Sequence, residues 1–142
     1  METNYDENCI FCKILGGIIP SRKIYEDEDF IAILDAFPSA KGHVIIIPKM
    51  HVTNIFEMPD ELAAKVFGVA KKVAAAVKQA TGCDGVNILQ NNGKAAGQSV
   101  FHLHVHVIPR FLDDSLNITW DPNTLEDAVM DEIADKIRKN IK

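Results

Sequence analysis

The sequence predicts an α+β domain in which a largely antiparallel, five-stranded sheet is covered by helices. Three observations favour this fold class. The β-prone runs and the helical patterns are grouped along the chain and do not alternate regularly, as they would in a parallel α/β fold. One long segment has the apolar periodicity of an amphipathic helix. Residues 101–110 alternate histidines with apolar residues, which is the period of a strand.

The size and composition of the chain are those of one globular domain. Its 142 residues are 47% hydrophobic and 25% charged, and no stretch approaches the ~20 apolar residues of a membrane-spanning helix. We therefore expect a single domain over residues 1–142. The net charge of −5 argues against broad binding to nucleic acid or anionic membranes, but it leaves room for a small phosphate ligand. The acidic, polar first residues do not resemble a secretory signal, so we expect a cytoplasmic protein with reduced thiols.

The first half of the chain is predicted to form a short helix and three strands. Residues 9–15 are apolar and precede Gly16 and Gly17, which suit the end of a helix. Residues 23–25 and 30–34 are β-prone and flank an acidic turn, so they should pair as a hairpin. Residues 44–47 form an unbroken β-branched run, which indicates a strand that is buried on both faces.

The second half is predicted to contain two helices and two further strands. Over residues 60–80, apolar residues recur every three or four positions and Gly82 follows, which predicts a long amphipathic helix. Strands are expected at residues 86–89 and 100–108, on either side of a loop. Apolar residues then repeat every four positions behind Thr124, a candidate N-cap, and predict a C-terminal helical extension over about residues 122–141.

The strand expected at residues 100–108 carries His102, His104 and His106 at two-residue spacing. Alternate side chains of a strand point the same way, so the three imidazoles should line one face opposite an apolar face. Imidazole can transfer protons, attack as a nucleophile or bind metal near neutral pH. The row alone therefore fits a metal site, nucleophilic catalysis by one histidine held by its neighbours, or a plain solvent-facing surface.

The residues around this row resemble the signature of the histidine-triad (HIT) family. Residues 97–108 are similar to the family's pattern, in which Gly-Gln-Ser or Gly-Gln-Thr precedes three histidines separated by apolar residues. Further segments resemble HIT landmarks in the expected order, at residues 10–14, 19–21, 35–38, 43–49 and 91–93. The resemblance implies a homodimeric α+β enzyme that binds a purine nucleotide and transfers its nucleoside monophosphate group to water through a nucleotidyl-histidine.

The resemblance also implies roles for single residues. His104 resembles the nucleophile that attacks the α-phosphorus, His106 the histidine that hydrogen-bonds the α-phosphate, and Ser99 the hydroxyl that assists the leaving group. The resemblance assigns nucleotide binding to Asp35 at the ribose, to Asn91 and Gln98 near the phosphates, and to Ile10, Phe11 and Ile14 at the base. Without the resemblance, Asp35 and Asn91 would be taken as turn residues, and Ser99 equally well as a hydroxyl at the start of a strand.

Cys9 and Cys12 form a Cys-x-x-Cys pair that should project from one side of the short helix. In a cytosolic protein such a pair can be a redox pair, half of a zinc site or a coincidence. His51 and His102 lie where the cysteine-bearing branch of the HIT family has zinc-binding histidines. The resemblance therefore implies a structural Cys2His2 zinc site, and the alternative is two buried, reduced thiols.

These observations together favour a nucleotide hydrolase of the HINT/Fhit-like type. The N-terminal half resembles the nucleoside phosphoramidase branch, but the chain lacks that branch's Trp-Pro-Pro-Gly end, and residues 107–110 resemble the dinucleoside polyphosphate hydrolases instead. The leaving group stays open, and no role is assigned to Cys83, His43 or the segment around Trp120. Three other hypotheses remain: a nucleotide-binding scaffold without catalysis, a hydrolase with its metal on the three histidines, and an enzyme that deadenylates nucleic acid.

Overall fold

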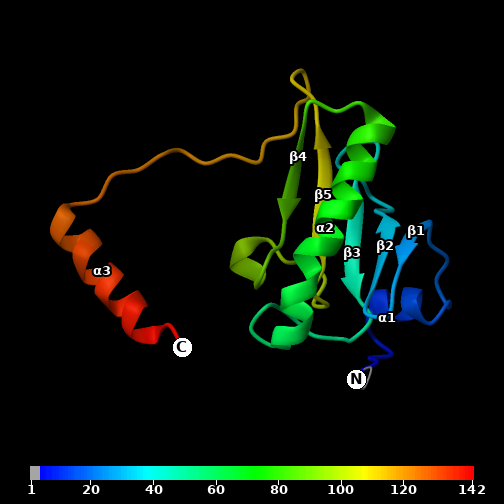
Figure 1. Ribbon diagram of the computed structural model, residues 1–142, viewed down its shortest axis with the longest axis horizontal. Coiled ribbons are helices and arrows are strands. Elements are labelled where there is room, and N and C mark those ends of the chain that lie inside the picture. Colours follow the sequence, from blue (N-terminus) through cyan, green and yellow to red (C-terminus); the bar gives the residue numbers. More distant parts are fainter. Residues whose placement is uncertain (1–3) are drawn as a thin grey trace.

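The computed structural model describes residues 4–142 and contains one five-stranded antiparallel sheet (Figure 1). In chain order the elements are α1 (Ile10–Leu15), β1 (Lys23–Glu26), β2 (Phe30–Leu34), β3 (Val44–Pro48), α2 (Asp60–Thr81), β4 (Gly85–Leu89), the 3-10 turn η1 (Lys94–Ala96), β5 (Val105–Arg110) and α3 (Asp127–Asn140). The spatial order of the strands is β1-β2-β3-β5-β4, and each neighbouring pair is antiparallel. The predicted α+β class and antiparallel sheet are confirmed.

Strand β3 lies at the centre of this sheet and is buried along its whole length, as its β-branched run predicts. Its side chains alternate between two cores. Val44 and Ile46 pack on the side of α2, whereas Ile45 and Ile47 pack on the side of α1. Each fully buried aliphatic side chain of this kind contributes roughly 1.5–3 kcal/mol. The central strand therefore fixes both faces on which the helices rest.

Helix α2 crosses one face of the sheet (Figure 1). Leu62, Val69, Val73 and Val77 repeat on one side of the helix and are buried there. The helix ends at Gly82, whose positive φ of 66° is costly for other residues, and this end matches the predicted one to within one residue. This apolar stripe therefore explains how α2 packs on the sheet.

Strand β5 is shorter at its start than the sequence predicts. It begins at Val105, because the backbone N–H of Leu103 donates to the carbonyl of Val52, 2.8 Å away in the loop after β3, and not to a neighbouring strand. Leu103, Val105 and Val107 still pack toward α2, so the predicted apolar face is confirmed. Of the three histidines of the row only His106 lies on a strand.

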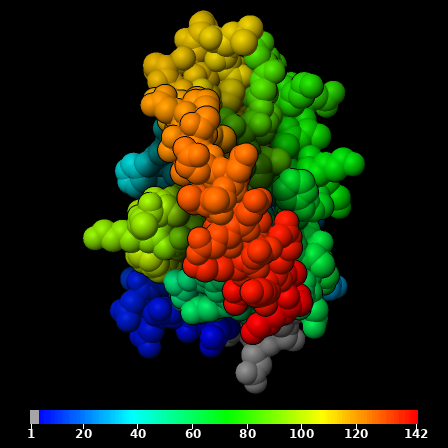
Figure 2. Space-filling view, turned by 90° about the vertical axis from the view of Figure 1, so that its left-hand side faces the viewer, coloured from blue at the N-terminus to red at the C-terminus, as the bar shows by residue number. Residues whose placement is uncertain are grey.

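The last 26 residues of the sequence form an arm, residues 117–142, that stands apart from the body of the molecule, residues 4–116 (Figure 1). The predicted C-terminal helix is present as α3, but it begins at Asp127, and its capping residue is Glu126 without a side-chain cap bond. The sequence suggested Thr124 as the N-cap, and this prediction is wrong. Seen from the side in Figure 2, the arm crosses in front of the body, and no residue of α3 is buried. Within residues 4–142, no helix is long and apolar enough to cross a membrane.

Candidate functional site

His104 is a buried imidazole whose protonation is fixed by one backbone contact. Its Nδ1 lies 2.7 Å from the carbonyl oxygen of His102. A carbonyl only accepts, so Nδ1 carries the proton and Nε2 keeps a free lone pair in the neutral ring. Burial lowers the pKa of His104 below its usual value, which favours that neutral ring. The side chain therefore has a free Nε2 lone pair that can act as a nucleophile or a proton acceptor near neutral pH.

His106 is held by His43, a residue that the sequence left without a role. Nε2 of His43 lies 2.9 Å from Nδ1 of His106, and Nδ1 of His43 accepts a hydrogen bond from the backbone N–H of Ser39 at 3.0 Å. Nε2 of His43 must then carry the proton and donate it to His106. In neutral His106 the remaining nitrogen, Nε2, is consequently the donor. Burial lowers the pKa of both histidines, and that of His106 falls to about 4.

A pocket of about 330 Å³ opens beside these histidines. Its walls come from α1, from β2 and the residues after it, from β3 and β5, and from the segment before β5. The residues that line it are Ile10, Phe11, Ile14, Ile33, Asp35, Ala36, Phe37, Ile45, Ser99, Val100, His104 and His106. The volume is in the range of small-molecule sites, and a few polar groups converge in a mostly apolar lining. The pocket is therefore the candidate ligand site.

Most of the predicted site residues meet in this pocket. Ile10, Phe11 and Ile14 form its apolar wall, as their clustering on one side of α1 predicts. Sequence reasoning missed Ile33 and Ile45. The signal was available, because Ile33 and Asp35 are two positions apart and Ile45 pairs with His106 across the sheet.

Asp35 supplies the one carboxylate of the pocket. Its Oδ1 accepts the backbone N–H of Phe37 at 2.9 Å, and its Oδ2 lies 3.5 Å from Nε2 of His43. The carboxylate is partly exposed, so its oxygens have further lone pairs to offer a ligand. It can accept hydrogen bonds from hydroxyl groups bound in the pocket.

Two of the predicted nucleotide-binding residues, Gln98 and Asn91, do not line the pocket. Gln98 is buried, and its side chain accepts the N–H of Gly93 at 2.8 Å and donates to the carbonyls of Thr53 and Val100. These bonds fasten the loop before Ser99, so the structure gives Gln98 a positioning role. Asn91 is partly buried in the same loop, and its predicted ligand contact stays a prediction.

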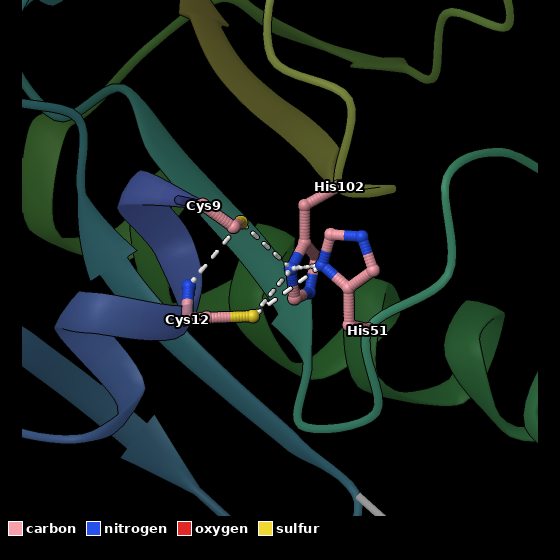
Figure 3. Close-up of side chains that lie close together, drawn as sticks. All are labelled: Cys9, Cys12, His51 and His102. Carbon is pink, nitrogen blue, oxygen red and sulfur yellow. Dashed lines mark hydrogen bonds between the residues drawn. The ribbon is translucent and has the colours of Figure 1, made fainter. Parts of the chain in front are cut away.

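Four predicted metal ligands converge beside the pocket (Figure 3). Sγ of Cys9 and Sγ of Cys12 lie 3.4 and 3.6 Å from Nδ1 of His102, Sγ of Cys12 lies 3.3 Å from Nδ1 of His51, and the two Nδ1 atoms are 3.1 Å apart. Zinc bonds of about 2.0–2.3 Å separate the ligands of a tetrahedron by roughly 3.3–3.8 Å. The group is thus a four-donor cluster that can hold a metal ion.

The surroundings of this cluster also suit a cation. Nε2 of His102 donates to the carbonyl of Pro48 at 2.9 Å, which orients the ring and turns Nδ1 toward the cluster. Burial raises the pKa of Cys12 to about 11, so its thiolate needs a nearby positive charge. No disulfide joins Cys9 and Cys12, since both are free. Donor type and spacing therefore suit a bound metal ion.

The pocket and the metal cluster share residues. The ring of His102 belongs to the cluster, while its carbonyl accepts the Nδ1 proton of His104. The ring of Phe11 meets His102 and His104 edge-on, at centroid distances of 5.9 and 4.9 Å. A shift of His102 would therefore move the bond that fixes the protonation of His104.

Solved structures resemble most or all of the chain. A HIT family member from Bacillus subtilis has a TM-score of 0.91 at 43% identity and covers 96% of this chain and 99% of its own. A Streptococcus mutans UA159 protein has a TM-score of 0.93 at 42% identity and covers 100% and 92%. A structure from Mycobacterium smegmatis, described as a Zn-bound histidine triad family protein, has a TM-score of 0.73 at 43% identity and covers 81% and 84%.

The family is evident from sequence comparison as well. Residues 17–113 match the model of the HIT domain. Protein hit of Bacillus subtilis is 50% identical over 80% of this chain and 79% of its own length. An adenylylsulfatase of Arabidopsis thaliana is 44% identical, covering 77% and 55%, and an adenosine 5'-monophosphoramidase of Schizosaccharomyces pombe is 37% identical, covering 95% and 99%. The chain therefore belongs to the histidine-triad (HIT) family.

Proposed function

We propose that the protein is a nucleotide hydrolase that transfers a purine nucleoside monophosphate group to water through a covalent bond to His104. The observation that carries this proposal is the contact between Nδ1 of His104 and the His102 carbonyl, which leaves Nε2 as a free nucleophile at the pocket. Two relatives are named for hydrolysis at an adenosine 5'-phosphate, as monophosphoramidase and adenylylsulfatase, and this supports the substrate class.

The lining of the pocket matches the parts of such a nucleotide. The base packs against Ile10, Phe11 and Ile14, and Asp35 accepts the ribose hydroxyls. The α-phosphate then lies at His104 and His106, where the Nε2–H of His106 donates to a nonbridging oxygen. Asn91 and Gln98 are proposed to act near the phosphates through the loop that they belong to.

The reaction divides into two displacements at phosphorus. In the first, the Nε2 lone pair of His104 forms a bond to the α-phosphorus while the bond to the leaving nitrogen or oxygen breaks, and the Ser99 hydroxyl protonates the departing atom. The ring becomes cationic, with its Nδ1 proton held by the His102 carbonyl. In the second, water attacks phosphorus and passes one proton back to the Ser99 oxygen, the P–N bond breaks, and its electron pair returns to Nε2 of His104, so both residues are restored.

We infer that Cys9, Cys12, His51 and His102 hold a structural zinc ion. Four protein ligands fill a tetrahedron, so no position remains for water or substrate. The Zn-bound relative from Mycobacterium smegmatis supports the choice of metal. A metal shared by the three histidines of the row is disfavoured, because Nδ1 of His102 turns to the cysteines and Nδ1 of His106 to His43.

The proposed working form is a homodimer in the cytoplasm, with residues 1–142 acting as one HIT domain. Free, buried cysteines fit a reducing compartment. The net charge of −5 supports a small nucleotide, and not nucleic acid or a membrane surface, as the ligand.

The experiment is to incubate the protein with adenosine phosphoramidate or with a diadenosine polyphosphate, stop the reaction without acid, and measure the intact mass. We expect an adenylylated protein whose adduct is lost in His104→Ala. Phe101→Ala is the matched control, because Phe101 is exposed close by and does not line the pocket. The ratio of kcat/KM for the two substrates identifies the leaving group.

Two results would contradict this proposal. Turnover that His104→Ala leaves unchanged removes the covalent mechanism. Tight nucleotide binding without turnover of either substrate class favours the scaffold hypothesis instead.

A further inference from the structure

A second pocket adjoins the ligand pocket at Ile14. It has a volume of about 270 Å³ and lies between the end of α1, the segment after this helix, and strands β1 and β2. Ile14 lines both pockets, and Ile31, two positions before Ile33 of the ligand pocket, lines the second one. Lys23 and Glu26 bring opposite charges to it. We call it the edge pocket, because β1 is an edge strand of the sheet (Figure 1).

A bulge in β1 turns both of these charges toward the same face of the sheet. Lys23 lies opposite Ile33 of β2. The register then shifts, so that Glu26 lies opposite Ile31. Residues three apart in an unbroken strand point to opposite faces, but the extra residue of a bulge brings them to a common face. Ile31 and Ile33 both pack on the side of α1. Lys23 and Glu26 therefore face that side too, and Nζ of Lys23 lies 2.8 Å from Oε1 of Glu26.

The register of the sheet places Lys23 in line with His106. His106 pairs with Ile45 of β3, which pairs with Ile33 of β2. Ile33 pairs in turn with Lys23 of β1. Neighbouring strands lie about 4.8 Å apart, so three spacings put roughly 14 Å between the Cα atoms of His106 and Lys23. Ile45 and Ile33 lie between them and line the ligand pocket. The ligand pocket therefore extends from His106 toward the edge pocket.

A bound nucleotide would point its base into this direction. This step rests on the proposed function, in which the α-phosphate lies at His106 and the base packs against Ile10, Phe11 and Ile14. In an extended nucleotide the Watson–Crick edge of the base is the end that lies farthest from the phosphate. Because Ile14 belongs to both pockets, this edge would face the edge pocket. The two charges of β1 are thus placed to contact it.

The charges on Lys23 and Glu26 suit the edge of guanine. Guanine has an acceptor, O6, beside two donors, N1–H and the N2 amino group. An ammonium can donate to O6, and a carboxylate can accept from both donors. Adenine has an amino donor at position 6, where the ammonium of Lys23 would meet it without an acceptor. Hydrogen bonds from Lys23 and Lys49 lower the pKa of Glu26, so its carboxylate is charged at neutral pH.

We propose that Lys23 and Glu26 contact the edge of the base and give the ligand pocket a preference for guanine over adenine nucleotides. Lys23 donates to O6, and Glu26 accepts from N1–H and N2–H. The two side chains are 51% and 44% exposed, so water weakens each contact. We therefore expect guanosine monophosphate (GMP) to bind about three- to ten-fold more tightly than adenosine monophosphate (AMP). AMP still binds, because the contacts of its ribose and phosphate do not depend on the base.

Calorimetric titration of the full-length chain with GMP and with AMP measures this preference. Lys23→Met keeps the length of the side chain but removes its charge and its donors, so the ratio of GMP affinity to AMP affinity should fall at least three-fold. Lys49→Met is the matched control. Lys49 also pairs with Glu26, at 3.0 Å, but it lines neither the ligand pocket nor the edge pocket. Its loss should leave the ratio of the wild type unchanged, even if both nucleotides bind more weakly.

A second pair of measurements tests Glu26. Inosine monophosphate (IMP) has O6 and N1–H but lacks the N2 amino group, so the wild type should bind it less tightly than GMP. Glu26→Gln replaces one acceptor oxygen with an amide nitrogen that only donates. We expect this variant to bind GMP and IMP with nearly equal affinity.

Three results would overturn the proposal: a wild type that binds AMP at least as tightly as GMP, equal ratios in Lys23→Met and Lys49→Met, or a difference between GMP and IMP that Glu26→Gln leaves unchanged. Failure of the proposed hydrolysis gives a different result. The wild type would then show the guanine preference in binding and the expected response to the variants, yet turn over no phosphoramidate or dinucleoside polyphosphate. If none of the three nucleotides binds, both proposals are wrong.

Discussion

Nε2 of His43 lies 2.9 Å from Nδ1 of His106, and this contact decides which nitrogen of His106 carries the proton. Because Nδ1 of His43 is occupied by the N–H of Ser39, its proton sits on Nε2 and points at His106. His106 therefore keeps its own proton on Nε2. A residue outside the histidine row thus sets the hydrogen-bonding state of a residue within it.

Replacing His43 should harm the reaction through His106. In His43→Ala, Nδ1 of His106 loses its donor, so we expect kcat to fall by about ten-fold or more, with a smaller change in KM. His43→Gln keeps an N–H donor and should recover part of the loss. Nitrogen chemical shifts of the His106 ring should report the Nε2–H form in the wild type and a mixture in His43→Ala.

Equal losses in the alanine and glutamine variants, together with an unchanged His106 ring spectrum, would mean that His43 only fills space. The melting temperature of each variant is the control for folding, because His43 is buried immediately before β3.

Periodicity predicted the body of the fold well because local burial decides it. The stripe from Leu62 to Val77 and the run from Val44 to Ile47 each have only one arrangement that hides their apolar side chains. The start of β5 was beyond such reasoning, since it depends on the hydrogen bond between Leu103 and Val52, which are far apart in the sequence.

The site residues also include some that the sequence predicts and some that it does not. Those within the family signature, such as His104, were named from the sequence, but the contact of His43 with His106 spans 63 positions and has no local pattern. The four proposed metal ligands came from the resemblance alone, because the spacing from Cys12 to His51 and His102 carries no periodic signal. The position of α3 could not be predicted from burial, because no residue of this helix is buried.

Stability should decline in mild acid because of His106. Its pKa is about 4 in the folded protein, chiefly through burial and then through the nearby His104 and His43, and about 6.5 in an unfolded chain. Between these values the unfolded state binds more protons, so the free energy of unfolding falls as pH drops. The contribution is complete above pH 6.5 and lost by pH 4.

Urea unfolding at pH 7.5, 6.5, 5.5 and 4.5 checks this expectation. Between pH 7.5 and pH 4.5, the free energy of unfolding should fall by about 1–2 kcal/mol more in the wild type than in His106→Gln, after allowance for the partly exposed ring. Both proteins have the same four cluster residues, so the difference between them reports on His106 and its interactions with His43 and His104. Parallel pH dependences would contradict the assigned pKa shift.

Loss of one cysteine ligand should remove the metal and loosen α1. We expect Cys12→Ser to lose its bound zinc and to melt roughly 10 °C or more below the wild type, because metal binding contributes directly to folding. Cys83→Ser is the matched control, since Cys83 is also a buried free cysteine but does not belong to the cluster. Elemental analysis after purification without chelators measures the zinc content of the two variants, and thermal unfolding measures their melting temperatures. A wild type without metal, or a Cys12→Ser protein with a full complement, would refute the site.

The hydrogen bonds of Arg110 should hold the base of the arm, residues 111–116, against the body. Its guanidinium reaches Asp114 with two nitrogens and also Asn87 and Leu116, a geometry that the single ammonium of lysine cannot reproduce. In Arg110→Lys we expect faster hydrogen exchange and faster proteolysis between residues 111 and 126. Arg138→Lys is the control, because Arg138 also pairs with an aspartate but is exposed on α3. If both variants resist protease as well as the wild type does, contacts other than the hydrogen bonds of Arg110 hold the base of the arm.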